Sequence, residues 1–261
     1  MRDVNTFQGG WALQVAFTPK ELGESQVQGF RVVVLDVLRA TSAICAGLHN
    51  GIRCFRPVLT TEESLALAEQ GFIPAAEREG LVAPGFEVGN SPLVFREPRF
   101  RGTKIALTTT NGTRALWAAK KAGAVEILVG SFLGLEVLVQ ELLRQPCPTV
   151  LLCSGWQNEF SWEDTLLAGA LADGLLAGKH CTEHLLQNDE QGRYRVQDDR
   201  VQAARSLWLN HRHDLQAAIR LSSHYARLAS AGLEEDIAFC AQLDACPVFG
   251  RLVGEDLVLG N

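Results

Sequence analysis

Short apolar runs, rich in β-branched residues, alternate with longer amphipathic runs along the first two thirds of the chain. The short runs predict strands at residues 30–37, 52–58, 104–109, 125–130 and 148–154. Apolar residues at helical spacing predict helices at residues 42–49, 62–70, 112–121, 135–143 and 163–178. Strands that are apolar along nearly their whole length are typical of a sheet covered by helices on both faces. The pattern therefore predicts a layered α/β/α fold with a mainly parallel or mixed sheet.

The remaining apolar runs are weaker or purely helical. Three of them, at residues 11–17, 248–253 and 256–259, are expected as strands added at the edges of the sheet. Helical patterns dominate from about residue 198, at 201–209, 215–221, 223–231 and 233–242. We predict an α/β core over residues 1–185 and a helix-rich C-terminal part over residues 186–261, packed on the core. One continuous domain is the alternative, and the polar run 187–200 is the best candidate for a joint.

Composition narrows the range of partners and compartments. The 261 residues include 24 Lys plus Arg and 30 Asp plus Glu, a net charge of −6, which argues against nucleic acid or an anionic membrane surface as partner. The seven cysteines, at positions 45, 54, 147, 153, 181, 240 and 246, are odd in number and have no CxxC spacing. Together with a start that lacks an apolar signal region, they predict a cytoplasmic protein. A homo-oligomer remains an open alternative.

Polar residues at the ends of predicted strands are the first candidates for chemistry, because ligands bind beyond the carboxyl ends of parallel strands. Asp36 ends the first predicted strand, and Arg39 leads into the following helix. A carboxylate between Leu35 and Val37 needs a cation or hydrogen-bond donors. Thr41 and Ser42, by contrast, are typical of a helix cap.

A second polar strand end is TTTNGTRAL, residues 108–116. It offers hydroxyls, a small amide side chain and a glycine that tolerates positive φ, followed by a helix N-terminus whose N–H groups and dipole favour an anion. The candidate anion-binding residues are Thr109, Thr110, Asn111, Gly112, Thr113 and Arg114. A plain Thr/Asn helix cap is the alternative, and Arg114 either clamps an oxyanion or lies on the surface.

Two further segments carry candidate residues. Glu163 and Asp164 begin a long predicted helix after Ser161, in a pattern that fits a capping box but that would also bind Mg²⁺ in a cleft shared with Asp36. The segment AAERE, residues 75–79, supplies Glu77 and Arg78. It runs into a Gly- and Pro-rich loop, residues 80–92, that is long enough to cover a site.

The histidine pairs are weaker candidates. His180 and His184 are spaced i, i+4, and His211 and His213 are separated by one residue. Neither pair has a cysteine or acid at ligand spacing, so we expect no transition-metal site there.

The four motifs VVVLDVLRATSAI, GFEVGNSP, TTTNGTRAL and CSGWQNEFSWEDTLLAG, in this order, resemble the 2-phosphosulfolactate phosphatase family. The resemblance extends from about residue 30 to residue 248 and includes SSHYARLASAGLEEDIAFC. It implies an α/β, Mg²⁺-dependent phosphatase acting on the route to coenzyme M. It also implies site roles for Asp36, Arg39, Glu77, Arg78, Asn90, Thr110, Asn111, Gly112, Thr113, Glu163 and Asp164.

On this reading the substrate is a small anionic phosphoester. We expect catalytic roles for Asp36, Arg39, Glu77 and Arg78, and substrate binding by Asn90 and residues 109–114. Asp36, Glu163 and Asp164 would bind Mg²⁺, and Arg39 or Arg114 would neutralise the remaining charge. Attack by water and an aspartyl-phosphate on Asp36 both remain open.

Two departures from the family pattern leave the physiological substrate open. The third motif carries two tryptophans and a Gln-Asn where smaller residues are expected, and Ala75-Ala76 replace a glycine before Glu77. A non-catalytic module that binds a phosphorylated or sulfonated metabolite is the alternative function. Clustered carboxylates favour the enzyme, because an anion binder gains nothing from them without a metal.

Overall fold

The computed structural model describes residues 6–7, 10–23, 27–177 and 193–260. Cys181, the pair His180 and His184, and the predicted joint between residues 185 and 186 lie outside the described residues. The strands are β1 (Thr6–Phe7), β2 (Gly10–Ala16), β3 (Arg31–Leu35), β4 (Cys54–Pro57), β5 (Phe72–Arg78), β6 (Leu81–Val82), β7 (Lys104–Thr108), β8 (Glu126–Gly130), β9 (Thr149–Cys153), β10 (Arg193–Val196), β11 (Gly250–Val253) and β12 (Asp256–Leu259).

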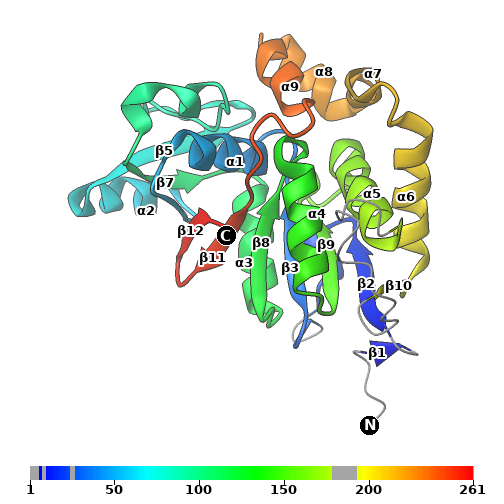
Figure 1. The fold of residues 1–261 in the computed structure, drawn as a ribbon. Coiled ribbons are helices and arrows are strands. Elements are labelled where there is room, and N and C mark those ends of the chain that lie inside the picture. Colours follow the sequence, from blue (N-terminus) through cyan, green and yellow to red (C-terminus); the bar gives the residue numbers. More distant parts are fainter. Residues whose placement is uncertain (1–5, 8–9, 24–26, 178–192, 261) are drawn as a thin grey trace.

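The sheet is mixed, and its strand order is β1-β2-β9-β3-β8-β11-β12-β4-β7-β5-β6, with β10 beside β2. It contains two parallel groups. Strands β2, β9, β3 and β8 form one group, and β4, β7 and β5 form the other. The antiparallel hairpin β11–β12 connects them, since β11 pairs with β8 and β12 pairs with β4 (Figure 1).

The predicted α/β/α layering is confirmed by the way successive residues of β3 pack. Val33 and Leu35 belong to one hydrophobic core, which also takes in Leu138 of α4 and Leu167 of α5. The alternate residue Val34 belongs to a second core on the other face, with side chains of α1 and α3. Strand side chains point alternately to opposite faces, so an all-apolar strand needs a layer of helices on each side.

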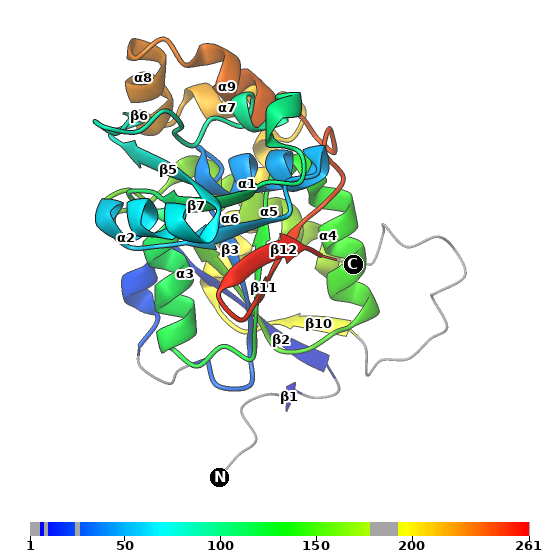
Figure 2. The ribbon, with the colours of Figure 1, turned by 90° about the vertical axis from the view of Figure 1, so that its left-hand side faces the viewer.

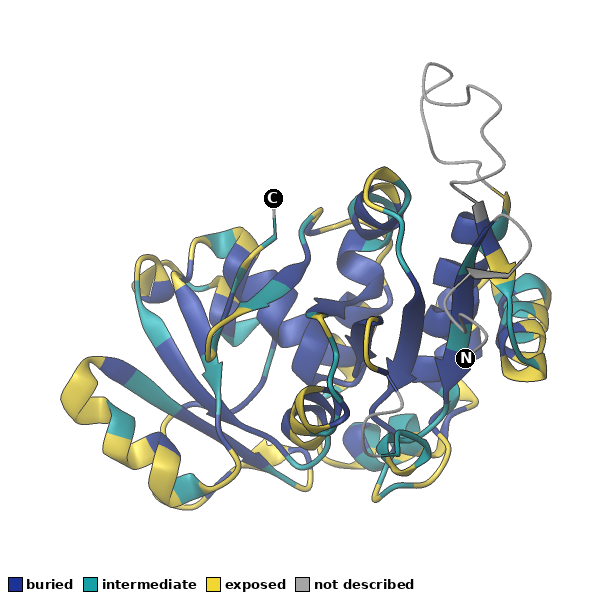
Figure 3. Cartoon of the chain, turned by 90° about the horizontal axis from the view of Figure 1, so that it is seen from below, coloured by how far each residue is buried: buried dark blue, intermediate teal, exposed yellow. Residues whose placement is uncertain are grey.

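The helices agree closely with the sequence pattern. They are α1 (Ala40–Asn50), α2 (Thr61–Ala66), α3 (Gly112–Lys121), α4 (Leu135–Arg144), α5 (Trp162–Ala177), α6 (Asp199–His211), α7 (Leu215–Arg220), α8 (Ser223–Ser230) and α9 (Glu234–Cys240). Helix α5 is buried along nearly its whole length, and α6 covers its outer side (Figure 1). Seen from below, the strands are mostly buried and exposed residues gather on outer helices and turns (Figure 3).

One sequence expectation about the sheet is wrong. The runs at 248–253 and 256–259 were expected at sheet edges, yet β11 and β12 lie between the two parallel groups. Backbone pairing between segments far apart in the chain leaves no mark in a local apolar pattern. The segment around Glu77, for which no element was predicted, lies in β5, which runs through Pro74 and pairs with β7 over residues 72–76.

The three short helices α7, α8 and α9 lie together at the top of the molecule in Figure 1. In the turned view, α8 and α9 lie above β5, β6 and α1 (Figure 2). Loop 80–92 is irregular apart from β6, as the sequence predicts. Among the described residues, no helix has both the length and the apolar character needed to cross a membrane.

Candidate active site

A small cavity lies where the polar strand ends meet the C-terminal helices. Its lining comes from five separate parts of the chain: the end of β3, the end of β5 with loop 80–92, the segment after β7, the segment after β9, and helix α8. The lining residues are Asp36, Leu38, Arg39, Glu77, Gly80, Asn90, Asn111, Trp156, His224 and Leu228. Five of the residues expected from the sequence are thus brought to one cavity: Asp36, Arg39, Glu77, Asn90 and Asn111.

Asp36 lies where the end of β3 meets the start of α3. Its Oδ1 accepts a hydrogen bond from Ala40 N at 3.1 Å. Its Oδ2 lies beside Gly112, where an added Cβ would come within 2.8 Å of that oxygen. Burial is the main cause that raises the pKa of Asp36 to about 6, and the nearby charges of Glu77 and Glu163 add to it. Asp36 is therefore a buried carboxylate placed against the N-terminus of α3.

Gly112 has a different role from the one expected. The sequence suggested that a positive φ requires this glycine, but Gly112 is not among the glycines with positive φ. A Cβ there would meet Ala40 Cβ at 2.7 Å as well as the Asp36 carboxylate. Glycine is needed because α1, α3 and Asp36 approach too closely for any side chain.

Two threonines after β7, Thr109 and Thr113, form hydrogen bonds with each other. Thr109 N donates to Thr113 Oγ1 at 3.1 Å, and Thr113 N donates to Thr109 Oγ1 at 3.2 Å. These two side chains therefore stabilise the turn into α3. Asn111 makes no side-chain capping bond to α3. Its Oδ1 instead accepts from Gln157 N at 3.3 Å, which connects the segments after β7 and β9.

Glu77 holds the β5 end, the β7 end and loop 80–92 together. Its carboxylate accepts from Gly80 N at 2.6 Å and from Thr110 N at 3.2 Å. The Thr110 hydroxyl donates to the same carboxylate at 3.2 Å. Glu77 is buried, and these contacts fix the backbone of residues 109–113 relative to the cavity.

Arg39 forms a buried network that holds loop 80–92 over the cavity. Its guanidinium pairs with Asp236 of α9. Its Nη2 donates to Gly80 O at 2.5 Å and to Asn90 Oδ1 at 2.9 Å. Ser91 Oγ donates to Asp236 Oδ1 at 2.7 Å. The Nη atoms of Arg39 are thus engaged with protein groups.

The acids at the start of α5 differ in their surroundings. Asp164 Oδ1 accepts from Val37 N at 2.9 Å, and its Oδ2 accepts from Gly155 N at 3.2 Å. Burial first, and then the charges of Glu163 and Asp36, raise the pKa of Asp164 well above its ordinary value. Burial is the largest single influence on Glu163 and disfavours its charge. The hydrogen bond from His224 Nδ1 at 2.9 Å, the charge of His224 and weaker hydrogen bonds together outweigh burial and lower the pKa of Glu163.

The carboxylates around Asp36 are better suited to Mg²⁺, which keeps some water ligands, than to a metal ion whose ligands all come from the protein. Among the described residues, no three His, Cys, Asp or Glu side chains are grouped closely enough to hold a metal ion. Mg²⁺, however, usually takes only one or two carboxylates and completes its shell with water and phosphate oxygens. Asp36 and Glu163 stay the expected ligands, and a cation beside Asp36 would offset the nearby charges of Glu77 and Glu163 that disfavour its charged form. Asp164 is less available, because backbone N–H groups occupy both its oxygens.

Two expected site arginines lie outside the cavity lining. Arg78 donates to Glu77 O at 2.7 Å and to Thr108 Oγ1 at 3.3 Å. Arg114 is exposed on α3. Their roles in the reaction remain predictions.

Sequence reasoning missed the cavity residues from the C-terminal helices, His224 and Leu228, and the Arg39 partner Asp236. A lone histidine or acid on a short amphipathic helix has no spacing that distinguishes it from a surface residue. Trp156 was also missed as a lining residue, although its motif was singled out as unusual.

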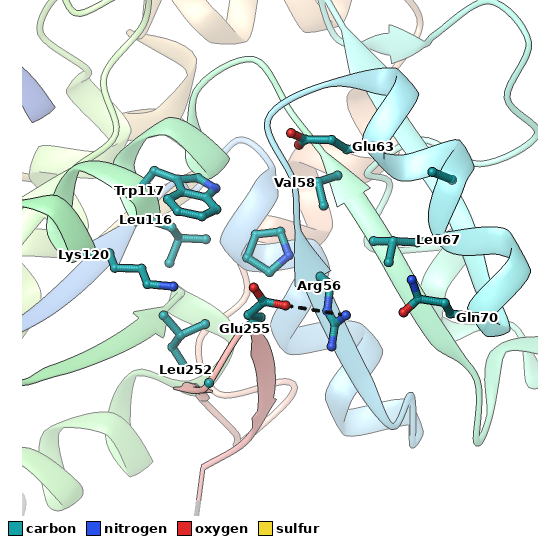
Figure 4. Close-up of a pocket in the computed structure, with 13 residues that line it drawn as sticks. Arg56, Val58, Glu63, Leu67, Gln70, Leu116, Trp117, Lys120, Leu252 and Glu255 are labelled. Carbon is teal, nitrogen blue, oxygen red and sulfur yellow. Dashed lines mark ion pairs between the residues drawn. The ribbon is translucent and has the colours of Figure 1, made fainter.

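A larger pocket of about 520 Å³ lies elsewhere, between α2, α3 and the β11–β12 hairpin. Figure 4 shows Leu116, Trp117 and Lys120 of α3 on one side and Leu67 and Gln70 on the other. Arg56 pairs with Asp256 and Glu255 of the hairpin. None of the strand-end acids lines this pocket, so the chemistry is expected in the smaller cavity.

Comparison with known proteins finds similar sequences along most of the chain. A family model described as 2-phosphosulpholactate phosphatase matches residues 16–254. A probable 2-phosphosulfolactate phosphatase from Symbiobacterium thermophilum is 36% identical over 231 residues, covering 86% of this chain and 93% of that protein. One from Thermotoga maritima is 36% identical over 240 residues, covering 90% and 94%. One from Clostridium acetobutylicum is 29% identical over 235 residues, covering 89% and 93%.

Proposed function

This chain belongs to the 2-phosphosulfolactate phosphatase family, and on that premise we propose that it hydrolyses the phosphoester of a small 2-hydroxy acid. The proposed substrate is 2-phosphosulfolactate, and the products are sulfolactate and inorganic phosphate. The observation that carries the proposal is the contact of Asp36 with the N-terminus of α3 at Gly112. A helix N-terminus favours a tetrahedral oxyanion, and a carboxylate beside it can act on the group bound there.

In the proposed reaction the phosphoryl group lies at the N-terminus of α3, close to Asp36 and Asn111. A water oxygen attacks phosphorus while the bond from phosphorus to the ester oxygen breaks. Asp36 accepts one proton of the water and passes it to the departing alkoxide of sulfolactate, while the other proton stays on the phosphate released. Without a bound cation, burial raises the pKa of Asp36 to about 6, which still leaves Asp36 mostly charged at neutral pH and able to accept a proton or hold a cation.

Other cavity residues position these groups. Glu77 fixes the backbone of Thr110 and Gly80. Arg39 holds loop 80–92 over the cavity through Gly80 and Asn90. Asp36 and Glu163 would hold Mg²⁺, which when bound would neutralise charge on the phosphoryl oxygens.

The test is a hydrolysis assay on 2-phosphosulfolactate and on a generic aryl phosphate, in excess chelator and with added Mg²⁺. We expect turnover with Mg²⁺, none in chelator, and restoration when Mg²⁺ exceeds the chelator. Full activity in chelator would remove the metal from the proposal. Binding of the phosphoester without any release of phosphate would favour the non-catalytic module instead. Phosphate trapped on Asp36 after acid quenching would replace attack by water with an aspartyl-phosphate route.

A further inference from the structure

Arg227 of α8 has hydrogen-bond donors that the protein does not use. Its Nε and Nη2 are buried and have no hydrogen-bond partner. Its Nη1 makes only a long contact, 3.4 Å, to Ser223 Oγ. Among the described residues, no other charged side chain has buried polar atoms without a partner. Leaving charged donors buried and unpaired is costly, so such a group calls for a ligand or a functional reason.

The position of Arg227 places these donors beside the cavity. Its guanidinium carbon lies 4.1 Å from the centre of the Trp156 ring, and Trp156 lines the cavity. The residues on either side of the same helix turn, His224 and Leu228, also line it. Stacking on an indole face leaves the edge of a guanidinium free to donate hydrogen bonds.

Among the described residues, no carboxylate forms an ion pair with Arg227. Glu163 is the acid that attracts it, but the two residues are not among the ion pairs of the described chain, and Glu163 pairs with His224 instead. The other arginines near the cavity are occupied or turned away: Arg39 and Arg78 donate to protein groups, and Arg114 is exposed. Arg227 is thus the described arginine beside the cavity that still has free donors.

A phosphorylated 2-hydroxy acid brings at least two anionic groups into a cavity that the acids Asp36 and Glu77 already line. Its phosphate has the N-terminus of α3 available, but its second acidic group needs a separate cation. We propose that Arg227 binds this second group, a carboxylate or a sulfonate, and thereby selects acidic phosphoesters over neutral ones. This inference rests on the proposed function. Guanidinium suits the task because its paired N–H groups match the oxygens of either anion.

The test compares Arg227→Met and Arg227→Lys with the wild type on four phosphoesters. They are 2-phosphosulfolactate, 2-phospholactate with a carboxylate only, the phosphoester of 2-hydroxyethanesulfonate with a sulfonate only, and ethyl phosphate with neither. Arg220→Met is the matched control, because Arg220 is exposed on the neighbouring helix α7. Folding of each variant is checked by circular dichroism and thermal melting.

We expect Arg227→Met to lower kcat/KM for 2-phosphosulfolactate by about 10- to 100-fold, mainly through KM, as for the loss of hydrogen bonds to a charged group. Ethyl phosphate should change by less than about threefold, and Arg227→Lys should recover part of the loss. Of the two substrates with a single acidic group besides the phosphate, the one whose kcat/KM falls more in Arg227→Met identifies the group that Arg227 binds. Equal losses on all four substrates, or no loss on any, would overturn the proposal.

Direct binding separates this inference from the proposed function. Calorimetric titration with sulfolactate measures recognition of the acidic groups without any hydrolysis. We expect the wild type and Arg220→Met to bind sulfolactate equally and Arg227→Met to bind it about 10- to 100-fold more weakly. If the wild type binds sulfolactate through Arg227 but hydrolyses no phosphoester, the proposed function fails and this inference stands. If the wild type hydrolyses the phosphoester and Arg227→Met binds sulfolactate as tightly as the wild type does, this inference fails and the proposed function stands. If Arg227→Met does not fold, Arg227→Lys decides by the same two measurements.

Discussion

Gly112 lies so close to Asp36 that a single methyl group on it would come within 2.8 Å of the carboxylate Oδ2. The same methyl group would meet Ala40 Cβ at 2.7 Å. The absence of a side chain at Gly112 therefore allows two expected parts of the site to lie close together. They are helix α3, which is expected to bind phosphate, and the carboxylate of Asp36, which is expected to act on it.

Gly112→Ala should abolish most phosphatase activity, because the added Cβ displaces Asp36 or the first turn of α3. A 1 Å displacement of a reacting group costs on the order of 100-fold in rate. Activity and thermal melting are measured on the same sample.

Gly174→Ala in α5 is the matched control for that variant. Its Cβ would meet Val139 Cγ2 at 3.0 Å, in the core and away from the cavity. We expect it to lower stability and leave kcat near the wild-type value. Equal kcat values in the two variants would contradict the placement of Asp36.

Asp36→Asn should lower turnover by orders of magnitude and at the same time stabilise the fold at pH 7. Because burial raises the pKa of Asp36 to about 6 from 3.8, the folded protein binds this proton more tightly than the unfolded chain. The charged carboxylate of Asp36 therefore lowers the stability of the folded protein. This loss of stability grows as the pH rises from about 4 to about 6, and it stays constant at higher pH. A shift of this size corresponds to a gain of up to about 3 kcal/mol in the variant.

The measurement is denaturant unfolding of the wild type and Asp36→Asn in chelator, from pH 4 to pH 8. The difference between the two free energies of unfolding should increase through that range and level off near pH 7. A constant difference across the range would mean that Asp36 has no raised pKa in the folded protein.

Asp236→Ala should have the opposite effect on stability. Its carboxylate pairs with Arg39, and the two side chains are only 6% and 4% exposed, so the variant leaves a buried guanidinium without its partner. Removal of one member of a buried pair costs about 3–5 kcal/mol. Because Arg39 holds Gly80 and Asn90, loop 80–92 should also become more sensitive to limited proteolysis. A melting temperature equal to that of the wild type would contradict the network.

Asn111→Ala should weaken competitive inhibition by inorganic phosphate with little change in stability. The loss of one hydrogen bond to a charged group corresponds to about 1–3 kcal/mol of binding. Stability should be unaffected to within about 0.5 kcal/mol, as for a surface substitution, because Asn111 makes no side-chain cap on α3.

The control for Asn111→Ala is Asp198→Ala. Asp198 is a true cap of α6, with Oδ1 accepting from Val201 N at 3.2 Å. Its loss should cost about 0.5–2 kcal/mol of stability and leave phosphate inhibition unchanged. Lower stability with intact phosphate inhibition in Asn111→Ala would remove residues 109–113 from phosphate binding.

Much of the fold and several cavity residues could be predicted because a buried parallel strand produces a recognisable apolar run in the local sequence. An all-apolar strand followed by Asp36, or by residues 109–113, is visible without any knowledge of tertiary contacts. Strand β5 was less visible, since Pro74 interrupts its pattern. The neighbours of β11 and β12 could not be predicted, because pairing across the sheet depends on residues far apart in sequence.

The cavity wall formed by α8 and α9 was hidden for a different reason. His224, Arg227 and Asp236 occupy short helices whose polar residues mostly face solvent, and only the folded chain brings these three to the strand ends. What distinguishes these three residues from surface residues is the partner that each one contacts. His224 contacts a buried glutamate, Arg227 an indole ring and Asp236 a buried arginine. Local sequence contains none of that information.

The central position of the β11–β12 hairpin has a consequence for how the chain is made. Until residues 250–259 have been synthesised, β8 and β4 each expose an edge that their final partners will cover. A nascent chain therefore carries two open β edges while the rest of the sheet is already able to form, and such edges recruit strands from other molecules. Ribosome-bound chains stalled before residue 250 should aggregate or recruit chaperones, and delivery of the hairpin as a separate peptide should suppress this by closing the gap.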